Sequence, residues 1–159
     1  MRPGVRLGVD VGTVRVGLAR SDRDGLLATP VSTVQRRGRS IEQVVEAVLA
    51  AAREVAAVEI VVGLPVALSG RDTASTVDAR RVATALAAAD PTPVRLVDER
   101  LTTVSATSAL HASGRDTRRS RSVIDQVAAV ILLQHALDVE RSRGEPPGVL
   151  ADPDGVARD

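Results

Sequence analysis

The chain has 159 residues and a formal net charge of +1, which allows one compact domain with its own hydrophobic core and excludes two ordinary domains. It contains no Cys, Trp, Tyr or Phe, so disulfides, thiolate metal sites and base stacking on aromatic side chains are excluded. No apolar run approaches the length of a membrane span, and the first residues lack the apolar segment of a signal peptide, so we expect a cytoplasmic protein with no membrane partner.

Short apolar segments open the chain. Their patterns predict three strands, at residues 5–11, 14–21 and 26–34. The connections at Gly12-Thr13 and around Gly25 are short, so we expect an antiparallel meander. Gly12 and Thr13 are expected to shape the turn rather than to react.

Helices and further strands follow. Ser40 is expected to cap a helix whose apolar residues from Ile41 to Leu49 recur with helical spacing. The apolar run at 58–64 predicts a strand covered on both faces. The segments after it predict, in order, a helix at 73–89, a strand at 93–97, a helix from Thr102 or Thr103 to about Ala112, a polar loop at 113–121 and a helix at about 122–141.

This order predicts an α/β fold with a five-stranded mixed sheet flanked by helices. The last two strands each follow a helix, and right-handed crossovers would make them parallel to the first strand, which is expected at the centre. Residues 1–143 form one domain in this prediction. Residues 144–159 are rich in Gly and Pro and are expected to be a disordered tail.

Asp10 is the most informative residue of the chain, because a carboxylate inside a buried strand is costly unless a cation pairs with it. Glu99 follows the fifth predicted strand and Asp125 begins the last predicted helix. The carboxyl ends of parallel strands are where open α/β sheets bind ligands, so the three acids could meet there. Such oxygen ligands fit Mg²⁺ or Mn²⁺, and two ions about 4 Å apart can promote phosphodiester hydrolysis.

Other roles are open for each acid. Asp10 could instead pair with an Arg or cap a turn. Asp98 rivals Glu99, since strict alternation would turn only one of them toward the site. Asp125 stands at capping-box spacing from Ser122, although Ala128 and Ala129 one turn later would allow the helix to approach the sheet closely.

Taken together, four ordered motifs make the chain resemble the YqgF/RuvX family of the ribonuclease H-like superfamily. The motifs are residues 7–22 (LGVDVGTVRVGLARSD), 62–65 (VGLP) with Gly70, 98–103 (DERLTT) and 125–134 (DQVAAVILLQ). The resemblance implies a ribonuclease H-like fold and an acidic triad of Asp10, Glu99 and Asp125, where the chemistry of the ligands leads us to expect a two-metal site for Mg²⁺ or Mn²⁺. It also implies a nuclease for the 5′ end of pre-16S rRNA or for Holliday junctions.

Nucleic acid is therefore the expected partner, and the protein is expected as a monomer or homodimer; a junction resolvase would need the dimer to cut two strands symmetrically. Without aromatic residues, binding should depend on charge contacts to phosphates. The Arg-rich loop before the last helix is the best candidate, with two Arg near the expected active edge. The candidate nucleic-acid contacts are Arg71, Arg100, Arg115, Arg118, Arg119 and Arg121.

Two interpretations from other classes remain. The segment from Asp10 to Gly17 resembles the first phosphate loop of the actin and sugar-kinase superfamily, which would make the chain an ATPase. That architecture closes two domains around the nucleotide, and this chain has length for one. A catalytically silent RNA-binding module would retain the same motifs without cleaving.

Overall fold

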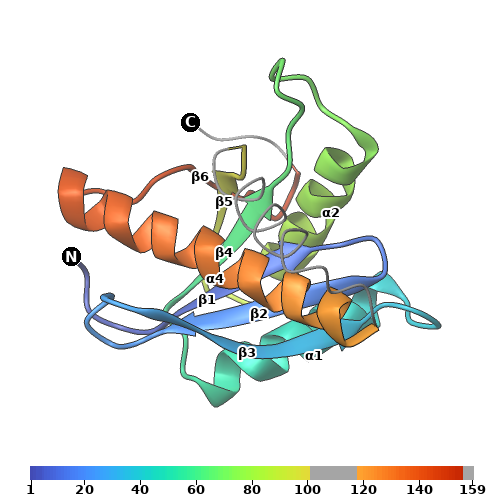
Figure 1. The fold of residues 1–159 in the computed structure, drawn as a ribbon, viewed down its shortest axis with the longest axis horizontal. Coiled ribbons are helices and arrows are strands. Elements are labelled where there is room, and N and C mark those ends of the chain that lie inside the picture. The colour runs from blue at the N-terminus through green and yellow to red at the C-terminus, as the bar shows by residue number, and fades with distance from the viewer. Residues whose placement is uncertain (101–117, 156–159) are drawn as a thin grey trace.

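The computed structural model describes residues 1–100 and 118–155, with the backbone alone for residues 118–123. The helix predicted at 102–112 and the candidate residue Arg115 lie outside the described residues. Within them, the chain forms a six-stranded sheet in the order β3-β2-β1-β4-β5-β6 (Figure 1). The elements are β1 Arg6–Val11, β2 Arg15–Ser21, β3 Ala28–Gln35, α1 Ile41–Glu54, β4 Glu59–Leu64, α2 Ala74–Ala89, β5 Val94–Asp98, α4 Arg118–Arg143 and β6 Val149–Leu150.

The predicted topology is confirmed. Strands β1, β2 and β3 form the antiparallel meander, and β4 and β5 run parallel to the central β1. Helices α1 and α2 cover one face of the sheet, and α4 crosses the other face (Figure 1). Because side chains alternate along a strand, Leu7 and Val9 of β1 enter the core under α1 and α2, and Gly8 and Asp10 turn toward the face with α4.

Helix α4 packs closely on β1 because small residues meet there. A Cβ atom on Gly8 would lie 2.9 Å from Leu133 Cβ and 3.1 Å from the Ala129 carbonyl oxygen. Ala128 and Ala129 are both buried, which confirms the close approach expected from the sequence. Their small side chains let the helix backbone come near the strand that carries Asp10.

The structure differs from the prediction at two places. Helix α4 (Arg118–Arg143) already includes Arg118, four residues ahead of the expected start at about Ser122, and Arg has a high helix propensity. Within residues 144–155, for which the sequence predicted a disordered tail, Val149–Leu150 pairs antiparallel with β5 as a sixth strand. A two-residue strand has no periodicity to detect in sequence. Its role is to cover the free edge of β5.

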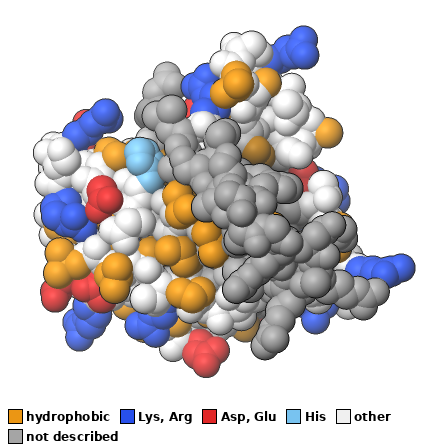
Figure 2. Space-filling model, in the orientation of Figure 1, with side chains coloured by type: hydrophobic (Ala, Val, Ile, Leu, Met, Phe, Trp, Pro, Cys, Tyr) orange, Lys and Arg blue, Asp and Glu red, His pale blue; other side chains and the backbone are white. Residues whose placement is uncertain are grey.

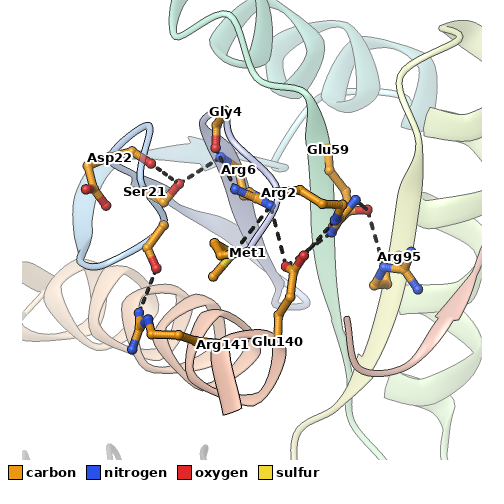
Figure 3. A network of polar contacts seen from close by, with 11 residues as sticks. Met1, Arg2, Gly4, Arg6, Ser21, Asp22, Glu59, Arg95, Glu140 and Arg141 are labelled. Carbon is orange, nitrogen blue, oxygen red and sulfur yellow. Dashed lines mark hydrogen bonds and ion pairs between the residues drawn. The ribbon is translucent and has the colours of Figure 1, made fainter. Parts of the chain in front are cut away.

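Five charged side chains meet where β1, β4 and β5 begin (Figure 3). Arg2 lies 2.6 Å from Glu140 of α4 and 3.1 Å from Glu59 of β4, which also pairs with Arg95 at 3.3 Å. Arg6 has a side chain only 1% exposed, and its guanidinium lies 3.4 Å from Glu140. This network joins the N-terminal segment, the sheet and α4 at the edge opposite Asp10.

Within the described residues, no helix combines the length and the apolar character that crossing a membrane requires.

Candidate active site

Asp10 and Glu99 come together at the carboxyl edge of the parallel strands. Asp10 is partly buried near the end of β1, and Glu99 directly follows β5 with 5% of its surface exposed. Their carboxyl groups share a hydrogen bond. Burial raises the pKa of Asp10, the bond to Glu99 lowers it, and the nearby charge of Asp125 raises it, with a net upward shift. Carboxylates crowded together in a largely buried setting disfavour one another's charge, and a bound cation would relieve that repulsion.

Two strand glycines make room for the partners of Asp10. Asp10 pairs with Gly17 of β2, and a Cβ atom on Gly17 would overlap the backbone carbonyl of Asp125. On the other side Val9 pairs with Val62, so Gly63 is the next residue beside Asp10, and its Cβ would overlap the Glu99 carboxylate. The signal was present in the sequence, since glycine inside a strand often marks a close approach.

Asp125 lies within α4 rather than in its first turn, so it does not cap the helix. Its Oδ2 atom accepts a hydrogen bond of 2.9 Å from Arg15 Nε at the start of β2. Burial raises the pKa of Asp125, while the bond and charge of Arg15 act to lower it. The sequence left open an Arg partner for Asp10, but the Arg here pairs with Asp125. Arg15 was not singled out by any sequence pattern.

The donor set fits a divalent cation only in part. Among the described side chains, no group of three His, Asp or Glu residues is arranged to hold a metal ion. Mg²⁺, however, often takes one or two carboxylates together with waters and substrate phosphates. Asp10 and Glu99 are such a pair. Asp125 could join them after its ion pair with Arg15 opens.

Asp98 and Glu99 are separated by their environments. Asp98 has a side chain 41% exposed that lies 2.7 Å from Arg100. Its partial burial acts to raise its pKa, but the hydrogen bonds and charge of Arg100 outweigh this, and the pKa lies below its ordinary value. Arg100 therefore neutralises Asp98 in this structure, not the buried acids.

We expect Glu99→Gln to lose the nuclease activity that the sequence resemblance implies and Asp98→Asn to retain it. Gln keeps the shape of Glu99 but removes one of the two paired carboxylates, whereas the Asp98 side chain is 41% exposed and bonded to Arg100. Initial cleavage rates of both variants at matched metal concentration measure the difference. An inactive Asp98→Asn beside an active Glu99→Gln would reverse the assignment.

The remaining candidates lie around this edge. Gly12 shapes the β1–β2 turn, since its N–H donates to the Arg15 carbonyl at 2.9 Å, and Thr13 is exposed beside it. Arg71 is exposed in the loop after β4. Contrary to the predicted loop, three candidate arginines belong to the first turns of α4, where only the backbone is described: Arg118, Arg119 and Arg121.

Comparison with known proteins identifies a matching family and several similar proteins. A family model described as RuvX, Holliday junction resolvase, matches residues 4–139. A protein of Clavibacter michiganensis subsp. michiganensis is 60% identical over 97% of this chain and 98% of its own length. A protein of Streptomyces coelicolor is 50% identical over 93% of this chain and 88% of its own. Both are named "Putative pre-16S rRNA nuclease".

A solved structure shares the fold. The structure described as T. thermophilus RuvC in complex with Holliday junction substrate aligns with a TM-score of 0.57 at 18% identity. The alignment covers 90% of this chain and 99% of that chain. The expected ribonuclease H-like fold is therefore confirmed, with six strands in place of five.

Proposed function

The chain belongs to the RuvX family, and on that basis we propose that it is a metal-dependent nuclease that matures the 5′ end of pre-16S rRNA. The hydrogen-bonded pair of Asp10 and Glu99 is the observation that carries the chemistry. The names of relatives 48–60% identical to this chain support the rRNA substrate. Processing of pre-rRNA would occur in the cytoplasm, where ribosomes assemble.

In this mechanism Asp10 and Glu99 would hold Mg²⁺ or Mn²⁺, and Asp125 would complete the set of carboxylates. The ions would supply an activated water and neutralise charge on the scissile phosphate, most simply as a two-metal site. Both carboxyl groups would have to be ionised to act as ligands, so binding of a cation would oppose the upward shift in the pKa of Asp10. Arg15 holds Asp125 beside the site and balances its charge.

Cleavage of Holliday junctions is the second candidate function. The description of the matching family model favours it directly. The fold shared with a RuvC–junction complex is compatible with it but is common to many activities. Symmetric cleavage of a junction would require two active sites, hence a homodimer, whereas processing of one RNA end needs a monomer only.

We expect the purified protein to cleave a pre-16S rRNA fragment with Mg²⁺ or Mn²⁺ and to fail with Ca²⁺, whose larger and looser coordination would misplace the water. The assay compares this RNA with a four-way DNA junction, each with the three ions and with EDTA. Preferential cleavage of the junction would show that the protein is a Holliday junction resolvase rather than a pre-16S rRNA nuclease.

Full activity in excess EDTA would overturn the metal-dependent mechanism. Binding of RNA without cleavage under any of the metals would instead support a catalytically silent RNA-binding module.

The ATPase alternative predicts that ATP raises the Tm of the protein, whereas the nuclease proposal predicts no such rise. The family and the shared fold both favour the nuclease over the ATPase.

A further inference from the structure

A second basic feature lies at the same edge of the sheet as Asp10. β3 runs parallel to β1, since each pairs antiparallel with β2, so the loop after β3 leaves the sheet beside the β1–β2 turn. Figure 1 shows the two connections side by side at the right of the view. Between them lies a pocket of about 480 Å³ lined by Thr13, Val14, Arg36, Arg37 and Arg39.

Arg36 fixes the geometry of this pocket. Its guanidinium donates to the Gly12 carbonyl at 2.8 Å and to Asp78 of α2 at 2.6 and 3.0 Å. Its backbone N–H donates to the Val14 carbonyl at 3.0 Å. The loop is thus attached to the turn that follows Asp10, with the charge of Arg36 already balanced by Asp78.

Arg37 and Arg39 have no such partner among the described residues. Both are exposed, and no side-chain hydrogen bond or ion pair with a described residue involves either guanidinium. Gly38 between them has a φ of +74° and open space around its Cβ position, so the tight turn leaves the pocket accessible. Glu42 is the acidic residue in the first turn of α1, and it too is exposed. Arg side chains project from the right-hand rim of the molecule in Figure 2, the side on which this loop lies in Figure 1.

We propose that Arg37 and Arg39 bind a backbone phosphate of the nucleic-acid strand that leaves the acidic site on the α1 side. The inference rests on the proposed function. Guanidinium groups present a rigid fork of donors that matches phosphate oxygens. The carboxylates at Asp10 and Glu99 repel a polyanion, and the positive charges of Arg37 and Arg39 at the neighbouring turn offset that repulsion and set where the strand lies.

The test compares two double variants that remove the same charge. Arg37→Gln with Arg39→Gln removes the free guanidinium groups of the pocket. Arg23→Gln with Arg143→Gln is the control, since these exposed arginines lie in the β2–β3 turn and at the last residue of α4, away from the carboxyl edge. Dissociation constants for the pre-rRNA fragment and for the four-way junction are measured in EDTA at several salt concentrations.

We expect the pocket variant to bind the nucleic acid more weakly than wild type. The slope of its log K against log salt should be smaller by roughly one unit for each phosphate that the variant no longer binds. The control should keep the slope of wild type. Thermal unfolding verifies that both variants fold, as expected from the exposure of all four residues. Parallel salt lines for pocket variant and wild type, or no binding of either nucleic acid by wild type, would overturn the proposal.

A further measurement with inorganic phosphate distinguishes a pocket that binds a nucleic-acid strand from one that binds a free anion. A rise in the Tm of wild type with millimolar phosphate that the pocket variant lacks, together with parallel salt lines, would assign the pocket to a free anion and overturn the inference. The outcome is also independent of cleavage. If the pocket variant reduces the salt slope but the wild-type protein never cleaves, the pocket is supported and the nuclease is rejected. If the wild-type protein cleaves but the salt lines of wild type and pocket variant are parallel, the nuclease is supported and the pocket is rejected.

Discussion

The Asp10→Asn protein should lose nuclease activity by about a thousandfold or more while it keeps its fold. The amide retains the shape of the side chain but removes the charge that would hold the metal, and a bound metal stabilises the transition state by several kcal/mol, each 1.36 kcal/mol being tenfold in rate. Single-turnover cleavage at matched Mg²⁺ and Mn²⁺ concentrations measures the loss. Asp24→Asn is the matched control, because it removes the same charge from the exposed β2–β3 turn.

Stability of the metal-free protein provides the second readout for Asp10→Asn. Burial raises the pKa of Asp10 above its ordinary value of 3.8, so the folded protein holds this proton more tightly than the unfolded chain. The cost to folding therefore grows as the pH rises from 3.8 through the raised pKa, and Asn avoids it. We expect the variant to be the more stable protein at neutral pH in EDTA, with the difference disappearing below pH 3.8. Activity equal to wild type would show that Asp10 is not a metal ligand.

Glu140→Gln should destabilise the protein by about 3 kcal/mol or more without a direct effect on the chemistry. Glu140 is buried on α4 and accepts bonds from Arg2 and from Arg6, whose side chain is 1% exposed (Figure 3). Removing one partner leaves a buried charge without full compensation, which typically costs about 3–5 kcal/mol. Chemical denaturation of wild type and variant at neutral pH measures this difference in the free energy of unfolding.

A neighbouring pair on the same helix supplies the control. Asp138 pairs with Arg141 at 3.1 Å with both side chains well exposed, so Asp138→Asn should change stability by no more than about 1 kcal/mol. Equal losses from both variants would show that the buried network does not stabilise the fold.

The same network should also respond to acid. Burial acts to raise the pKa of Glu140, but the hydrogen bond from Arg2 and the charges of Arg2 and Arg6 outweigh it, and the net shift is downward from 4.5. The stability that Glu140 contributes is present above 4.5 and is lost as the pH falls through its lowered pKa. The difference between wild type and Glu140→Gln should therefore narrow in that range.

The alternation and spacing of apolar residues were sufficient to predict the meander, both parallel strands and the helices α1 and α2. These patterns are local, because each strand or helix must present one periodic face to the core. The same reasoning identified Asp10, since a charge within a buried run is anomalous wherever the rest of the chain lies.

The boundaries near the end of the chain could not be obtained in this way. The first turns of α4 carry polar and basic residues with no apolar period, and β6 is too short to show one. Whether such a segment forms a helix or a strand depends on what it packs against. The free edge of β5 decides the conformation of Val149–Leu150.

The contacts within the candidate site also could not be predicted from the sequence alone. The sequence determined that Asp10 needs a partner and that acids follow β5 and occur near the start of the last helix. Only the assembled sheet decided that Glu99 turns inward while Asp98 pairs with Arg100, and that Arg15 meets Asp125 across 110 positions of sequence. The pairs Asp10–Glu99 and Arg15–Asp125 form where strand register and helix docking bring distant residues within hydrogen-bond reach. Gly17 and Gly63 signalled in the sequence that something approaches these strands closely, but only the packed structure shows that Asp125 and Glu99 are the residues that do so.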